Sequence, residues 1–203
     1  MTKKLTKALA ITACAVLLVA ATVMGTVAYL TSQATMSNTF AAGNVTITMD
    51  DAKTNEYGEE IQGNGAGRTT ENSYKLIPNV EYTKNAKIYV AEGSEPCYLF
   101  IELDERFTRD NSILTATFAD GWEALEDHPG IYVHSTTVNA LGAKVEIPAL
   151  ASFKVKAEAK AADLTPYVTE GETKVNTTAY AVQAIGFNSA KEAWEATFGA
   201  TQP

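Results

Sequence analysis

The stretch Val45-Thr46-Ile47-Thr48-Met49-Asp50 alternates apolar and polar side chains along its whole length. A period of two places Val45, Ile47 and Met49 on one face of an extended strand and the threonines on the other. One face of this strand is therefore expected to be buried and the other to meet solvent. Such half-buried strands are typical of antiparallel sheets, so the stretch indicates a mostly β fold.

Further strand candidates follow this stretch along the chain. Each is short, rich in Val, Ile, Tyr, Phe and Thr, and bounded by Gly, Pro, Asn or charged residues, which is the pattern of an antiparallel β-sandwich. In one of them Phe153 and Val155 face one way, with Ala157 and Ala159 after them, while Lys154 and its neighbours at even positions face the other way. The candidates are residues 85–91, 97–103, 112–119, 131–135, 143–147, 152–159 and 177–185.

A short helix is expected near the C-terminus. Ser189-Ala190-Lys191-Glu192 has the form of a capping box, in which the serine hydroxyl accepts the amide of Glu192 and the carboxylate returns a bond to the cap. Apolar residues follow at helical spacing, and Gly199 is suited to the position after the helix. Trp194 is predicted to bury this helix against the sheet; the alternative is that its indole stacks on a ligand.

Residues 51–72 are rich in Gly, Asn, Glu and Thr and contain few apolar side chains. We predict a long mobile surface loop for them. The expected organisation is therefore one β-sandwich domain over residues 44–199, interrupted by this loop and followed by a tail at 200–203.

Residues 1–28 have the three parts of a secretory signal helix: a basic start, an apolar run over 8–24 and small residues before Tyr29. Thr26 and Ala28 occupy the positions that a signal peptidase reads, so cleavage is predicted between Ala28 and Tyr29. Two alternatives stay open. Residues 8–30 carry no charge and are long enough to act as a retained membrane anchor, and the residues ending at Cys14 look like a lipoprotein cleavage box.

The chain has a formal net charge of −8, and its first 28 residues contain lysines but no acidic side chain, so the remainder is more acidic still. Such a polyanion repels phosphate backbones, and nucleic acid is not an expected partner. Only Cys14 and Cys97 are present. The first would leave with the signal, so no disulfide is expected, and Cys97 in its apolar stretch is predicted to be buried and inert.

No catalytic motif is evident, and we expect no enzymatic activity, cofactor or metal site. His128 and His134 do not belong to a spaced ligand pair. Glu126 and Asp127 could join them around a metal, but residues 126–130 are better explained as a polar hairpin turn. The adjacent carboxylates at 50–51 and at 104–105 are predicted to be solvated, with weak Ca²⁺ binding as the alternative.

The junction between signal and domain runs Thr26-Val27-Ala28-Tyr29-Leu30-Thr31-Ser32, then Ser37-Asn38-Thr39-Phe40-Ala41-Ala42-Gly43-Asn44-Val45-Thr46-Ile47. Over residues 24–49 this arrangement resembles the camelysin and TasA family. A weaker likeness, at Leu76-Ile77-Pro78 and at residues 179–184, is to uncharacterised proteins with the same signal type. The resemblance implies cleavage by a SipW-type signal peptidase and a jelly-roll-like β-sandwich. The middle of the chain does not follow TasA, so fibre formation is only an expectation.

In TasA the segment after the cleavage site is lent to the sheet of the next subunit, and the resemblance implies the same for residues 29–43. The stretch 30–40 is uncharged and rich in Thr and Ser, so it could add to an open sheet edge through its backbone. A flexible spacer is the alternative. The predicted donor residues are Leu30, Thr31, Thr39 and Phe40.

The expected function is that of a secreted cell-surface or extracellular matrix protein, and of a biofilm fibre subunit that self-associates after cleavage. Its contact with the membrane would be limited to the uncleaved signal. A monomeric adhesion or binding module is the alternative. A camelysin-type metalloprotease rests on the resemblance alone.

Overall fold

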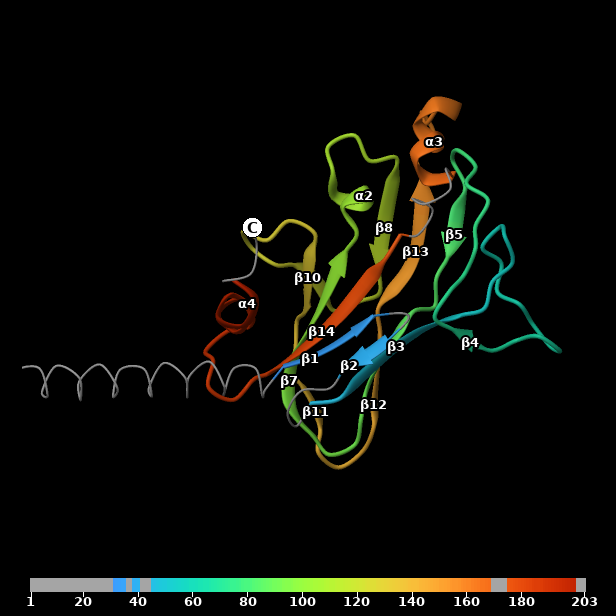
Figure 1. Ribbon diagram of the computed structural model, residues 1–203. Helices are drawn as coiled ribbons and strands as arrows, with labels where there is room; N and C mark the ends of the chain where they lie inside the picture. The colour runs from blue at the N-terminus through green and yellow to red at the C-terminus, as the bar shows by residue number, and fades with distance from the viewer. Residues whose placement is uncertain (1–30, 36–37, 41–44, 169–174, 200–203) are drawn as a thin grey trace, which may run out of the picture.

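The computed structural model describes residues 31–35, 38–40, 45–168 and 175–199. Within them the chain is mostly β, with antiparallel sheets and a few short helices, which confirms the predicted class (Figure 1). The predicted signal helix, residues 1–28, and the tail, residues 200–203, lie outside the described residues.

The largest sheet has seven strands in the order β2-β1-β14-β7-β10-β9, and β11 also pairs with β7. Every pairing in it is antiparallel. The strands are β1 (Thr31–Thr35), β2 (Asn38–Phe40), β7 (Ser94–Leu103), β9 (Trp122–Ala124), β10 (Ile131–His134), β11 (Val138–Ala140) and β14 (Thr177–Gln183).

Two smaller antiparallel sheets complete the β structure. The four-stranded sheet has the order β12-β6-β3-β4, and the three-stranded sheet has the order β5-β13-β8. Their strands are β3 (Ile47–Ala52), β4 (Arg68–Thr69), β5 (Glu81–Thr83), β6 (Lys87–Val90), β8 (Leu114–Phe118), β12 (Val145–Pro148) and β13 (Leu150–Val155).

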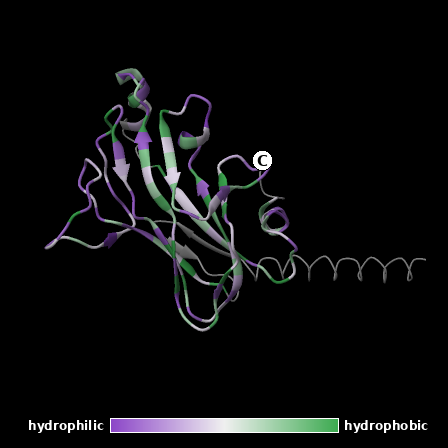
Figure 2. Cartoon of the chain, turned by 180° about the vertical axis from the view of Figure 1, so that it is seen from behind, coloured by the Kyte–Doolittle hydropathy of each residue, from purple (hydrophilic) through white to green (hydrophobic). Residues whose placement is uncertain are grey.

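The middle of β7 is apolar from Cys97 to Ile101, because side chains on both of its faces are buried there. Cys97, Leu99 and Ile101 are fully buried in a core that also contains side chains of β3 and β6 from the four-stranded sheet. Phe100 points to the opposite face, where it packs in a second cluster with Trp194. Figure 2 shows hydrophobic stretches along the strands and hydrophilic colour over several outlying loops. The seven-stranded sheet is therefore covered on both sides near its middle.

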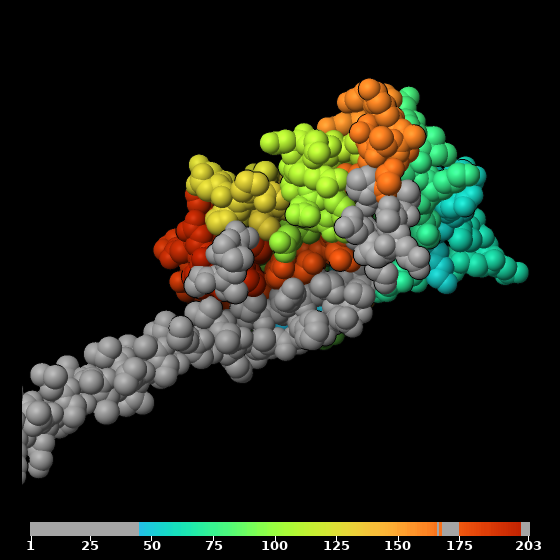
Figure 3. Space-filling model, turned by 45° about the horizontal axis from the view of Figure 1, so that its top comes forward, coloured from blue at the N-terminus to red at the C-terminus, as the bar shows by residue number. Residues whose placement is uncertain are grey.

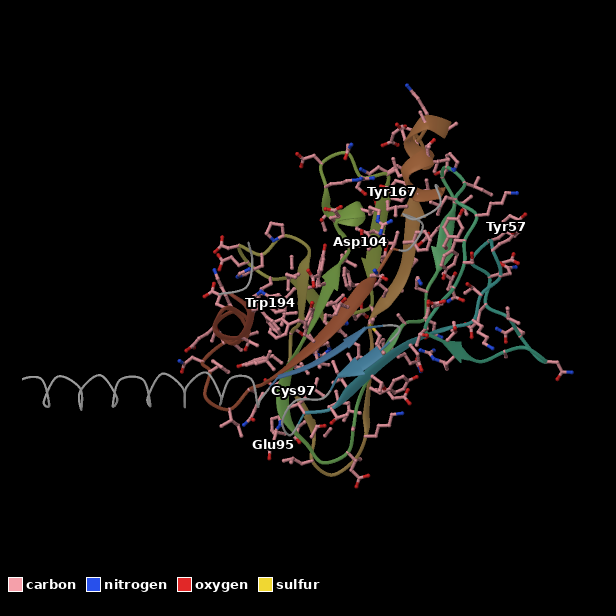
Figure 4. All side chains as sticks on the ribbon, viewed as in Figure 1. Tyr57, Glu95, Cys97, Asp104, Tyr167 and Trp194 are labelled. Carbon is pink, nitrogen blue, oxygen red and sulfur yellow. The ribbon has the colours of Figure 1, made fainter. Side chains whose placement is uncertain are left out.

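The helix α4 (Ala190–Phe198) covers this second face. Trp194 is only 3% exposed, and its ring lies 5.0 Å from that of Phe100, so the predicted anchoring of the helix is confirmed. Figure 4 shows Trp194 between α4 and the sheet.

The capping of α4 follows the prediction in part. The Ser189 hydroxyl accepts the amide of Glu192 at 3.1 Å, as expected. The carboxylate of Glu192, however, accepts the amide of Asn188 at 2.9 Å, one residue before the expected cap. Gly199 is the last capping residue of the helix and has φ −60°, so it does not adopt the left-handed conformation that the expected position after the helix favours.

A third cluster joins the three-stranded sheet to α3 (Ala161–Val168), a helix that the sequence pattern did not predict. Tyr82 and Phe153 stack there with ring centroids 4.7 Å apart. Arg109 donates to the Tyr167 hydroxyl at 2.7 Å and so ties α3 to the residues after α2 (Glu105–Thr108). Figure 3 shows α3 at one end of the molecule and α4 at another.

The segment 51–72, predicted to be a mobile loop, contains β4 and several specific bonds. Arg68 pairs with Asp50 at 2.6 Å, and the side chain of Asn72 accepts the amide of Thr54 at 3.0 Å. Gly58 is buried with φ +81°, and a Cβ there would lie 2.8 Å from the Cα of Tyr82. Only glycine allows this close approach to β5, so part of the segment packs on the domain.

Several strand boundaries differ from those predicted. The stretch 152–159 leaves the sheet after Val155, because Ala157 and Glu158 lie in an exposed turn. The stretch 143–147 begins its strand only at Val145. Strands β5, β9 and β11 were not predicted, since three residues are too few to display a period of two.

Candidate functional site

The edge of the seven-stranded sheet is built from the segment that follows the predicted cleavage site. β1 pairs with β14 in antiparallel register, from Thr31 opposite Val182 to Thr35 opposite Thr178. β2 returns along the outer side of β1, with Thr35 opposite Asn38. The hairpin of β1 and β2 thus lies between the predicted signal and the rest of the domain, and in Figure 1 it runs beside β14.

β14 needs a partner on both sides. β7 pairs with it along its whole length, from Thr177 to Gln183. Ala179 and Ala181 are fully buried in the core shared with the four-stranded sheet, and Val182 is 1% exposed on the other face. The folded state would be destabilised if the amides and carbonyls along the second edge of such a buried strand had no hydrogen-bond partners. β1 supplies those partners.

The predicted donor residues fall in this hairpin where the structure describes them. Thr31 begins β1, and Thr39 and Phe40 belong to β2. The predicted cleavage residues Ala28 and Tyr29, and the donor residue Leu30, lie outside the described residues. The structure therefore brings the segment to the sheet edge within one chain.

The histidine and carboxylate candidates are held by protein partners. Asp127 and Glu126 both contact the ammonium group of Lys191 on α4, at 2.5 and 3.3 Å. His128 lies 3.4 Å from Glu195, and His134 lies 3.0 Å from the carbonyl oxygen of Thr136. Among the described residues no group of three His, Cys, Asp or Glu side chains is arranged to hold a metal ion.

Residues 126–130 form the turn between β9 and β10, as predicted. The amide of His128 donates to Leu125 at 3.1 Å, and that of Ile131 donates back to His128 at 3.1 Å. In Figure 3 this turn and α4 are neighbours on the surface, as the ion pairs of Lys191 require. The polar residues here thus fasten α4 to the turn.

The acidic pair Asp104–Glu105 serves a local structural purpose. Asp104 caps α2 by accepting the amide of Arg106 at 3.0 Å, and it accepts the guanidinium of the same residue at 2.8 Å. Burial favours the neutral carboxyl group, but the bonds from Arg106 and from the amide of Asn176 outweigh it and lower the pKa of Asp104. Its oxygens are directed at these donors.

The pair Asp50–Asp51 is divided between two environments. Asp50 is half-exposed beside Arg68, whereas Asp51 is fully buried and bonds to Lys84, Asn72 and the amide of Asn85. The sequence analysis did not predict the buried group formed by Asp51, Lys84 and Asn72. The signal was the period of β3, because position 51 continues the buried face of positions 45, 47 and 49 and a buried carboxylate must find partners.

Lys84 is paired as well as buried. Its ammonium nitrogen lies 2.8 Å from the Oδ2 of Asp51 and 5.0 Å from the centre of the Tyr74 ring. Burial lowers the pKa of Lys84, but the charges and hydrogen bonds of Asp51 and Tyr74 together outweigh it, so that the net shift is upward.

Cys97 is a buried thiol on β7 (Figure 4). It has no exposed surface, and burial raises its pKa to about 12. The prediction of a buried thiol is confirmed, and its raised pKa disfavours the nucleophilic thiolate near neutral pH.

None of the described helices is long and apolar enough to cross a membrane. Comparison of the chain with protein-family models, with curated proteins and with solved structures found no match.

Proposed function

We propose that this chain is an exported cell-surface or extracellular matrix protein that assembles by lending the hairpin of β1 and β2 to the sheet of another copy. The observation that carries the proposal is the pairing of β1 with β14 immediately after the predicted signal. The role is structural and not catalytic. We further propose that a SipW-type signal peptidase releases the segment by cutting between Ala28 and Tyr29.

The shape of the domain is suited to such an exchange. The seven-stranded and four-stranded sheets share one core, which supports a jelly-roll-like β-sandwich as the architecture. β1 lies at the side of this arrangement, and residues 31–35 contain no charged and no large apolar side chain. Its pairing therefore depends mainly on backbone bonds, which an identical segment from a second chain would reproduce in the same register.

Cleavage would act as the switch between the two pairings. While the segment remains joined to the signal, it is confined to its own domain and to the membrane. Once it is free, pairing within one chain and pairing between chains satisfy the same backbone groups, and a raised concentration favours the second. The fibre is then a chain of completed sheets.

The alternative function is a monomeric adhesion or binding module. The pairing of β1 with β14 within one molecule favours this alternative. β14 then has a strand on each side, β1 and β7, and offers no free edge to a neighbouring molecule. The two functions therefore differ in where β1 lies in the working state.

The test is negative-stain electron microscopy of residues 29–203 beside residues 44–203 at equal concentration and pH. We expect filaments from the longer chain alone. An Ala34→Pro variant of the longer chain should also fail to form filaments, because proline removes a backbone donor in the middle of β1. Monodisperse particles from all three would refute intrinsic assembly and favour the binding module.

A further inference from the structure

The buried group around Asp51 contains a nucleophile, an amide and a shared carboxylate. The Oδ2 of Asp51 accepts from the Nζ of Lys84 at 2.8 Å and from the Nδ2 of Asn72 at 3.2 Å. The other oxygen accepts the amide of Asn85 at 2.8 Å. A single carboxylate oxygen therefore accepts both from the lysine nitrogen and from the side-chain amide nitrogen of Asn72. That amide nitrogen is the leaving group in any attack of the lysine on the Asn72 side chain.

We propose that Lys84 and Asn72 join in an intramolecular isopeptide bond, and that Asp51 relays the protons of the reaction. The proposal goes beyond the assembly function and is independent of it. The substrate is the folded chain itself, since its fold brings together side chains from β3, from the residues before β5 and from the residue after β5.

The reaction balances without any co-reactant. The Lys84 ammonium group passes one proton to Asp51, and the free amine attacks the Cγ of Asn72. A second proton moves from Nζ through the carboxyl group to Nδ2, the bond between Cγ and Nδ2 breaks, and Nδ2 leaves as ammonia. Asp51 then releases the first proton to solvent. The product is a secondary amide between Nζ and Cγ.

The amide of Asn72 is held for this attack. Its Oδ1 accepts the backbone amide of Thr54 at 3.0 Å, and its Nδ2 donates to the carbonyl oxygen of Ala52 at 2.8 Å. The Thr54 amide would stabilise the negative charge that develops on Oδ1 in the tetrahedral intermediate. Three hydrogen bonds, with Thr54, Ala52 and Asp51, thus fix the plane of the amide.

The surroundings make the proton transfer feasible. Asp51 is fully buried, and the side chain of Lys84 is 11% exposed beside the ring of Tyr74. In such a site the ammonium group loses hydration, and this desolvation acts against its charged form, although Asp51 and Tyr74 leave the net pKa shift of Lys84 upward. Because Nζ donates directly to Asp51 at 2.8 Å, the free amine is formed by proton transfer along this hydrogen bond rather than by loss of a proton to bulk water.

The bond would close a loop from Asn72 to Lys84 that contains β5. Of the two cysteines in the chain, Cys97 is buried in the core and Cys14 lies in the predicted signal. An amide cross-link would give an exported protein a covalent constraint of the kind that a disulfide supplies elsewhere.

Intact-mass spectrometry of the purified, folded full chain tests the proposal. The wild type should weigh less than its sequence by one ammonia molecule, and tryptic mapping should recover a branched peptide that links Lys84 to Asn72. Lys84→Arg should restore the full mass, because a guanidinium group does not attack the amide. Asp51→Asn should do the same where it folds. Lys87→Arg is the matched control, since Lys87 pairs with the exposed Glu146, and it should keep the deficit.

Two results would overturn the proposal. One is a wild-type chain of full sequence mass in a preparation that circular dichroism shows to be folded. The other is an ammonia deficit that maps to a succinimide at Asn64-Gly65, which also releases ammonia, with Lys84 found in an unbranched peptide.

Discussion

Replacing Trp194 by alanine should remove most of the contact between α4 and the seven-stranded sheet. The indole is 3% exposed, and its ring centroid lies 5.0 Å from that of Phe100, 5.4 Å from that of Tyr180 and 4.4 Å from that of Phe198. These rings form the cluster that covers one face of β7 and β14. Loss of the indole would therefore expose the middle of the sheet.

The expected loss follows from this burial. Truncating a buried aromatic side chain to alanine costs about 3–5 kcal/mol, and the contacts of Trp194 with the rings of Phe100, Tyr180 and Phe198 favour the upper part of that range. For a chain of this size the melting temperature should fall by about 6–20 °C. Urea unfolding followed by far-ultraviolet circular dichroism measures the change in the free energy of unfolding.

Ile185→Ala is the control, because Ile185 is 60% exposed. It should change the free energy of unfolding by less than about 0.5 kcal/mol. A Trp194→Ala variant that loses about 1 kcal/mol or less would refute the docking of α4 on the sheet.

Three further outcomes can be checked on the same protein. Iodoacetamide at neutral pH should leave Cys97 unlabelled until urea is added, because burial raises the pKa of its thiol to about 12, and peptide mapping reports the labelling. The free energy of unfolding should fall as the pH rises above about 10, the ordinary tyrosine value. Burial and the bond to Glu102 raise the pKa of Tyr180, so the folded chain keeps a proton that the unfolded chain loses; Tyr180→Phe should flatten this dependence in urea titrations at several pH values. Asp104→Ala should cost about 1–2 kcal/mol in thermal unfolding, because it removes the cap of α2.

The fold class could be predicted because the deciding features are local. The alternation at Val45, Ile47 and Met49 identified the buried face of β3, and the serine cap with Trp194 identified α4. Both signals lie within a few residues of the element that they predict. Short elements such as β9 and α2 lack such a signal, because one turn or three residues show no period and depend on their neighbours for stability.

The group around Asp51 could be anticipated only in part. The period of β3 placed a carboxylate on a buried face, which requires a partner, but the partners Asn72 and Lys84 lie 21 and 33 residues away. Nothing in the local sequence of either residue indicates this contact, since it depends on how the residues that follow β4 and β5 are brought to β3. The pairing of β1 with β14 is more distant still, and composition indicated only that residues 30–40 were able to form a strand.

Cysteine pairing between β1 and β14 tests the central claim most directly, because Thr35 lies opposite Thr178 in the register. A Thr35→Cys chain mixed with a Thr178→Cys chain under assembly conditions should oxidise to a disulfide between chains, seen as a dimer on a non-reducing gel. The Thr31→Cys chain, whose residue lies at the other end of β1, should not form this bond with Thr178→Cys. If the Thr35 and Thr178 mixture gives no interchain disulfide, while the double variant closes one within a single chain, then β1 stays in its own molecule and strand donation is contradicted.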